Sequence, residues 1–446
     1  MAGIELIPSA KRLITSLRDL GYDFSQAVAD IVDNSIEAGA SLVAIDVEFE
    51  GDDSWVRVAD NGKGMNPEQL REAMRYGAMR NYKADDLGKF GLGLKTASMS
   101  QCKCLSVASR SNPDRADIAA YSWDLEHIED TNRWEILPFQ RNGLAPTIRQ
   151  PLKETTGTVV LWQRLDRILG YKHPYGEFAR KRLSQTCREI ELHLGMVFHR
   201  FLAGETRHRR FKLLLNGNEI KPWDPFCRAE VKTKKLQAIP IAVDHDGASG
   251  EVLLEPFILP PQEDFSSPDA FRIASGPANW NQQQGFYIYR ANRMIQSGGW
   301  SNFRAPDEHT KLARIAVSFS PALDEAFKIN VAKMRVQLPM VIRDAVQKAI
   351  GPVTRLAREI YDRKPATPKA AAPRSAVISP ADLPPARLQP RPSTPEATAS
   401  PVASPSLLLT FEQWSEFLLA VATKQERPVV EGVLERLRAE TAEGGD

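Results

Sequence analysis

Three polar residues near the start of the chain stand at helical spacing. Asp30, Asn34 and Glu37 are four and three residues apart, which places them on one face of a helix expected to begin after Ser25 and to end before Gly39. A carboxylate at the first position can hold and deprotonate an attacking water, and an amide oxygen one turn later can complete an octahedral Mg²⁺ shell shared with phosphates. A solvated helix face is the alternative, and it is the commoner origin of such a stripe.

A second chemically competent segment, DNGKGM, follows an expected strand with the sequence WVRVAD. Gly62 and Gly64 permit tight backbone turns beside a flat ligand, and Asp60 can accept a hydrogen bond from an exocyclic amine such as that of adenine. Met65 completes the segment. An ordinary Asn-Gly β-turn is the alternative interpretation.

A glycine-rich segment, GKFGLGLKT, precedes a further expected helix. Its free backbone amides and the positive end of the helix dipole can bind phosphates, and a lysine can add a point charge. The segment is neither a Walker loop nor a Rossmann fingerprint, so taken alone it is weak evidence. The order of the three segments is the stronger signal, and together they predict a nucleotide pocket. Gly88, Gly91, Gly93 and Lys95 are the candidates for phosphate contact, and Lys89, Phe90 and Leu92 belong to the same predicted ATP-binding segment.

This order of segments resembles the GHKL ATPase superfamily, which includes gyrase B subunits, ninety-kilodalton heat-shock chaperones, histidine kinases and MutL-type mismatch-repair proteins. ADIVDNSIEAGA is similar to its first box, VADNGKGM to its second and GKFGLGLKTASMS to its third. GTVVLW resembles the Gly-Thr strand that completes the adenine pocket. Within the superfamily, GLGLKTASMS, GTVVLWQRL and FYIYRANRMI look most like the MORC-type branch and its bacterial relatives. The resemblance covers about residues 10–340.

The resemblance implies a role for each matching position of the pocket. Asp60 would bind the adenine amino group, and Thr158 would form a hydrogen bond near the base or its bound water. Asn34 would hold Mg²⁺, and the amides from Gly88 to Gly93 would wrap the phosphates of ATP.

Two further positions concern catalysis. Asp30 stands where many members have glutamate, so its carboxylate lies about one methylene further from the attacking water, and hydrolysis is expected to be slow. Lys333, in INVAKMRVQLP, resembles the lysine that the second domain of such ATPases sends back to the γ-phosphate. An exposed lysine at a strand end is the alternative.

The composition limits the classes of protein to consider. Lys and Arg number 58 against 56 acidic residues, so nucleic-acid contact requires a local basic patch, for which ARKR (179–182) and RHRRFK (207–212) are the candidates. Four scattered cysteines favour a reduced compartment. There is no secretory leader pattern and no run of about 18 apolar residues, so we expect a cytoplasmic protein that does not span a membrane.

The expected fold class is α+β, with a GHKL-type α/β sandwich followed by a smaller α/β domain. Eleven of the 31 prolines fall between residues 365 and 405, in a composition that cannot bury enough apolar surface to fold. The expected organisation is an ATP-binding domain over 1–170, a connecting helix over 171–210, a transducer-like domain over 211–363, a disordered linker over 364–406 and a C-terminal helical segment over 407–446.

The expected activity is hydrolysis of ATP to ADP and phosphate with Mg²⁺. The resemblance implies an ATP-gated homodimer that closes on DNA or a DNA-associated complex, in a setting such as bacterial defence or restriction, while the C-terminal helices contact a protein partner. A histidine kinase is disfavoured, because its phosphoacceptor helix should precede the ATP-binding domain and only about 25 residues precede the first box. A chaperone-like ATPase acting on protein clients, and an ATP-binding regulatory module with little turnover, remain as alternatives.

Overall fold

A computed structural model gives the fold of the chain between residues 8 and 363. The residues that it describes are 8–19, 21–77, 93–114, 117–140, 143–171, 173–207, 210–245, 248–328 and 338–363. The expected linker over 364–406 and the C-terminal helical segment over 407–446 lie outside them. Residues 1–366 belong to one folded unit, which contains two sheets.

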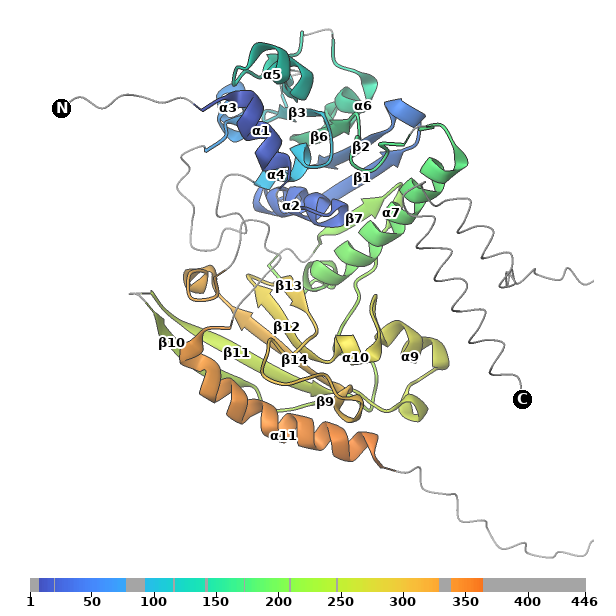
Figure 1. Cartoon of the computed structure of the whole chain (residues 1–446), viewed down its shortest axis with the longest axis vertical. Helices are drawn as coiled ribbons and strands as arrows, with labels where there is room; N and C mark the ends of the chain where they lie inside the picture. The colour runs from blue at the N-terminus through green and yellow to red at the C-terminus, as the bar shows by residue number, and fades with distance from the viewer. Residues whose placement is uncertain are drawn as a thin grey trace, which may run out of the picture. The chain divides into compact units, whose positions relative to one another are not determined.

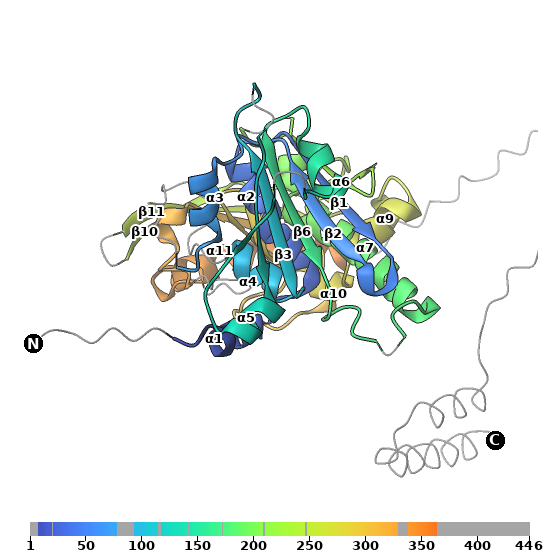
Figure 2. The same cartoon turned by 90° about the horizontal axis from the view of Figure 1, so that it is seen from above.

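The first sheet has eight strands in the order β5-β4-β3-β6-β2-β1-β7-β8. All neighbours are antiparallel except β1 and β7, and Figure 2 shows β3, β6, β2 and β1 side by side. Central β6 is buried over six consecutive residues, which explains its continuous apolar sequence. The strands are β1 (Leu42–Glu48), β2 (Trp55–Asp60), β3 (Cys104–Arg110), β4 (Ala119–Asp124), β5 (Leu137–Pro138), β6 (Gly157–Gln163), β7 (Lys212–Leu215) and β8 (Asn218–Glu219).

Helices pack on both faces of this sheet, and the larger layer centres on α2. Helix α2 begins at Phe24, because the Asp23 side chain accepts a hydrogen bond from the Gln26 amide; the expected N-cap, Ser25, is therefore wrong. Gly39, at φ +76°, follows the end of the helix as expected. The helices are α1 (Ala10–Arg18), α2 (Phe24–Glu37), α3 (Pro67–Met74), α4 (Gly93–Met99), α5 (Leu125–Thr131), α6 (Pro146–Arg149), α7 (Glu177–Val197) and α8 (His199–Leu202).

The second sheet has the strand order β10-β11-β14-β12-β13, with β9 paired to β11. Helix α11 packs against β11 and β14, as Figure 1 shows. The strands are β9 (Lys234–Lys235), β10 (Ile239–His245), β11 (Ala248–Ile258), β12 (Gly285–Arg290), β13 (Arg293–Ser297) and β14 (Ala313–Phe319), and the helices are α9 (Pro268–Ala274), α10 (Trp280–Gln283) and α11 (Arg343–Tyr361). We call Lys234–Tyr361 the second domain.

The two sheets with their helices confirm the expected α+β fold. One strand lies elsewhere than expected: Lys212–Leu215, which the sequence placed at the start of the second domain, pairs in parallel with β1 of the first sheet. Among the residues described, no helix is both long and apolar enough to cross a bilayer.

Candidate nucleotide-binding site

The end of β2 carries a carboxylate that is held by three donors. Asp60 Oδ1 accepts hydrogen bonds from the Gly62 amide at 2.8 Å and the Thr158 amide at 3.2 Å, and Oδ2 accepts one from the Ser35 hydroxyl at 3.0 Å. A carboxylate offers about four lone-pair directions, so these donors leave one for a ligand amine. Burial raises the pKa of Asp60 above its usual value, and the three hydrogen bonds partly offset that shift.

The corner after Asp60 is not the β-turn of a hairpin, because the chain continues into α3 rather than into a strand. The Asn61 side chain instead accepts hydrogen bonds from the Ser41 and Leu42 amides, each at 2.9 Å, at the start of β1. The Lys63 amide donates to the Ala38 carbonyl at 3.0 Å, which ties the corner to the end of α2. The corner is therefore anchored on both sides.

Two glycines let backbone segments approach closely at this corner. Gly64 has φ +64°, and a Cβ atom there would lie 2.0 Å from the Arg110 carbonyl oxygen. Gly157, at φ +149°, would place a Cβ atom 1.9 Å from the Asp60 carbonyl oxygen. No side chain fits at either position, so β2, β3 and β6 meet at the carboxylate only because both residues are glycine.

Thr158 lies directly opposite Asp60 in the register between β2 and β6. Its hydroxyl lies 3.0 Å from the hydroxyl of Ser109, a residue on β3 that the sequence did not single out. The Ser109 hydroxyl also donates to the Gly157 carbonyl and accepts from the Met65 amide, both at 2.8 Å. Ser109 therefore joins two of the expected pocket residues, Met65 and Thr158, and also contacts Gly157 at the start of β6.

The polar stripe expected on α2 is buried at its first position and reaches solvent at the other two. Asp30 is only 3% exposed, whereas Asn34 is exposed and Glu37 is half-buried. The Tyr22 hydroxyl donates to Asp30 Oδ2 at 2.9 Å, and a Cβ atom built on Gly93, at the start of α4, would lie 3.4 Å from that same oxygen. The Asp30 carboxylate thus lies against the start of the helix that follows the glycine-rich segment.

Tyr22 was not identified from the sequence, although its hydroxyl contacts Asp30, the residue that the sequence singled out as a candidate general base. Burial, followed by the nearby Asp30 carboxylate, raises the pKa of Tyr22 far above its usual value. The phenol therefore stays protonated at neutral pH and remains a hydrogen-bond donor to Asp30.

Lys95 was expected to add a charge for phosphate, and in the structure its ammonium contacts a backbone carbonyl. The side chain is buried, and Nζ donates to the Ala73 carbonyl in the last turn of α3 at 3.0 Å and lies 5.9 Å from the centre of the Tyr76 ring. Burial lowers the pKa of Lys95 to about 8. In this arrangement, Lys95 satisfies a carbonyl group that the helix end leaves without a partner.

A cation of the second domain reaches the α2 helix. Arg293, on β13, lies 2.8 Å through Nε from Asp33 Oδ2, and its terminal nitrogen lies 3.7 Å from Asp30 Oδ1. All three side chains are 5% exposed or less. Arg293 stands in the segment FYIYRANRMI, whose pattern predicted no role for this arginine. Gly88, Lys89, Phe90, Gly91, Leu92 and Lys333 lie outside the described residues.

Comparisons with known proteins identify relatives of the first part of the chain. Residues 22–158 match the family described as histidine kinase-, DNA gyrase B-, and HSP90-like ATPase. The chain is 26% identical over 220 residues to the DNA mismatch repair protein MutL of Haemophilus influenzae (strain PittGG), a match that covers 48% of this chain and 30% of MutL. It is 31% identical over 110 residues to Protein MICRORCHIDIA 4 of Arabidopsis thaliana, covering 22% of this chain and 14% of that protein.

A third relative, Protein MICRORCHIDIA 7 of Arabidopsis thaliana, is 34% identical over 90 residues, which are 19% of this chain and 13% of that protein. The chain thus spans less than a third of the length of these relatives. The N-terminal part of the chain is a domain of the GHKL ATPase superfamily, with relatives among MutL and MORC proteins.

Proposed function

We propose that the chain binds ATP with Mg²⁺ and hydrolyses it slowly to ADP and phosphate. The observation that carries this proposal is the position of Asp60, which stands in a corner that only glycine permits and retains one lone-pair direction for the exocyclic amine of adenine. Thr158 and Ser109 offer hydroxyls to the same part of the base or to a water bound beside it. The planar base would lie against backbone rather than side chains at Gly62 and Gly64.

The phosphates would extend from this corner toward α2 and the start of α4. Asn34 is exposed one turn after Asp30, so its amide oxygen is available to Mg²⁺ together with phosphate oxygens. Asp30 is the proposed general base for the attacking water. The amides from Gly88 to Gly93 and the Lys333 ammonium are proposed phosphate ligands on the strength of the family resemblance.

We further propose that ATP gates closure of a homodimer that acts on DNA. The support for action on DNA is the name of the MutL relatives, DNA mismatch repair protein. Strands β7 and β8 pair with the first sheet, so we assign them to the ATP-binding domain and propose that the transducer-like domain begins after them.

The direct test of nucleotide binding is a titration of the full chain with a fluorescent ATP analogue. Asp60→Asn replaces one acceptor oxygen by an NH₂ group and is expected to weaken binding about 10- to 100-fold, since a buried donor of the base loses its partner. Because burial raises the pKa of Asp60, wild-type affinity should also decline on acidification sooner than an ordinary aspartate would cause.

The matched control is Asp46→Asn, a change on β1 of the same sheet that removes an ion pair with Arg57. This variant is expected to bind ATP like the wild type. Equal binding by Asp60→Asn and the wild type would contradict the proposed pocket. ATP turnover with and without duplex DNA, and particle mass with a non-hydrolysable analogue, then test the clamp: a nucleotide-bound monomer indifferent to DNA would leave an ATP-binding module.

A further inference from the structure

A buried ion pair joins the second domain to the helix that carries the proposed general base. Arg293 Nε contacts both oxygens of Asp33, at 2.9 Å and 2.8 Å, and the other end of the guanidinium faces Asp30 at 3.7 Å. Asp33 and Arg293 are 260 positions apart in the chain. The contact therefore exists only when the second domain is packed against α2.

The positive charge of Arg293 offsets the repulsion between the Asp30 and Asp33 carboxylates. Asp30 and Asp33 stand almost one helical turn apart, both 3% exposed or less, and two ionised carboxylates so placed repel each other and lose hydration. A guanidinium between them supplies the opposite charge in a planar form that can serve both. His193 of α7 faces the same group, but burial and the arginine lower its pKa to about 4, so it carries no charge at neutral pH.

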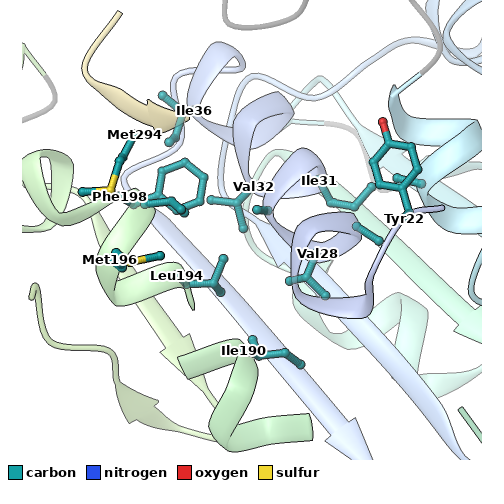
Figure 3. Packing of buried hydrophobic residues seen from close by; sticks show 14 of the residues in the cluster. Tyr22, Val28, Ile31, Val32, Ile36, Ile190, Leu194, Met196, Phe198 and Met294 are labelled. Carbon is teal, nitrogen blue, oxygen red and sulfur yellow. The ribbon is translucent and has the colours of Figure 1, made fainter. Parts of the chain in front are cut away.

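The surroundings of Arg293 are packed, which limits how the guanidinium can move. Figure 3 shows Ile36 and Val32 of α2 beside Phe198, which follows α7, and Met294 of β13. The guanidinium carbon lies 5.7 Å from the centre of the Phe198 ring. A shift of β13 relative to α2 would therefore change the position of the charge rather than be absorbed by side-chain motion.

Both oxygens of the Asp30 carboxylate are thus constrained, and by different parts of the chain. Tyr22 donates to Oδ2 from the loop before α2, and Arg293 faces Oδ1 from the second domain. We propose that Arg293 is a positioning residue for hydrolysis: the second domain, through Arg293 and Asp33, holds the Asp30 carboxylate in the orientation needed to activate water. This inference rests on the proposed function, in which Asp30 is the general base.

The test compares two buried arginines of the same β-hairpin in the full chain. Arg293→Met removes the cation at α2, whereas Arg290→Met removes an equally buried ion pair, with Asp324 at 2.7 Å, that lies wholly within the second domain. For Arg293→Met we expect kcat to fall about 10- to 100-fold, as for a misplaced catalytic group, while the Kd of a non-hydrolysable ATP analogue changes less than about threefold.

Arg290→Met should lower the melting temperature at least as much and yet retain kcat per folded molecule. Arg293→Lys, which keeps the charge, should recover part of the lost turnover. If Arg293→Met does not fold, Asp33→Asn takes its place, since the amide oxygen of the new side chain can still accept a hydrogen bond from Arg293 Nε. We expect Asp33→Asn also to lower kcat.

The outcomes separate the inference from the function on which it rests. Unchanged or increased kcat in Arg293→Met or its substitute, or an equal loss in Arg290→Met, overturns the inference alone while wild-type turnover still supports the proposed function. A wild-type chain that binds ATP without turning it over overturns the base assignment and the inference together, and one that binds no ATP overturns the proposed function.

Discussion

Replacement of Asp30 by asparagine separates binding from hydrolysis most sharply. The change keeps the size of the side chain and an oxygen that can accept from the Tyr22 hydroxyl, but it removes the charge that faces Arg293. Loss of a positioned general base is expected to lower kcat by about 100- to 10,000-fold. The lower limit corresponds to about 2.7 kcal/mol of transition-state stabilisation. The nucleotide Kd should change little, because the adenine corner does not involve this residue.

The cost to folding follows from the same geometry. Unit charges about 4 Å apart attract by about 4 kcal/mol at an effective dielectric constant of about 20, and the desolvation of the carboxylate offsets most of this. Since Arg293 keeps its shorter contact with Asp33, we expect Asp30→Asn to lower the free energy of unfolding by about 1–2 kcal/mol. Urea unfolding measures this loss.

Phosphate release under saturating ATP is the assay for turnover. Asp30→Glu is the companion variant: it keeps the carboxylate and should therefore retain turnover well above that of Asp30→Asn. If Asp30→Asn hydrolyses ATP at the wild-type rate, another group takes the proton from water and the reasoning from Tyr22, Arg293 and the start of α4 fails.

Three further predictions test contacts in the proposed pocket and beside it. Tyr22→Phe removes the donor to Asp30 and should lower kcat about tenfold with an unchanged nucleotide Kd; equal kcat values would show that the phenol does not orient the carboxylate. The pKa of Lys95 is about 8 in the folded chain and about 10.5 unfolded, so the unfolded chain binds more protons between these values and the free energy of unfolding should rise with pH, by up to about 3 kcal/mol. Urea titrations at both ends of that window should show the rise in the wild type and a smaller one in Lys95→Met. Gly157→Ala should weaken nucleotide binding and lower the melting temperature, because its Cβ would meet the Asp60 carbonyl at 1.9 Å; wild-type values in a thermal shift titration would count against the tight corner.

The sequence predicted the strand-to-loop corner well, because its chemistry is local. Glycines that permit close backbone approach and an aspartate that ends a strand are visible within six residues, and the structure places Thr158 opposite Asp60 in the neighbouring strand. The α2 helix was also predictable from its apolar periodicity. Its N-cap was not, because Asp23 and Ser25 are both good capping residues and only the backbone geometry decides between them.

The sequence did not predict which way individual side chains point or which distant residues they contact. The type and position of Lys95 suggested a phosphate ligand. The sequence could not indicate that its ammonium contacts the Ala73 carbonyl at the end of α3, 22 residues earlier in the chain. Ser109 and Arg293 were missed for a related reason, since their partners come from strands and helices far along the chain. The strand Lys212–Leu215 has no sequence feature that distinguishes pairing with β1 from pairing in the second sheet.

The contacts of Asp60 and those of Asp30 come from different parts of the chain. The three donors that hold Asp60, which are Ser35, Gly62 and Thr158, all belong to the N-terminal domain, so the proposed binding of the adenine base does not depend on the second domain. The Asp30 carboxylate, by contrast, is one methylene shorter than the glutamate of many family members, and it faces a cation supplied by the second domain. A shorter side chain has fewer rotatable bonds, so it has fewer ways to restore the position of its carboxylate when the helix or a partner moves. Variants should accordingly divide into two groups: those near Asp60 change Kd, and those near Asp30, Asp33 and Arg293 change kcat.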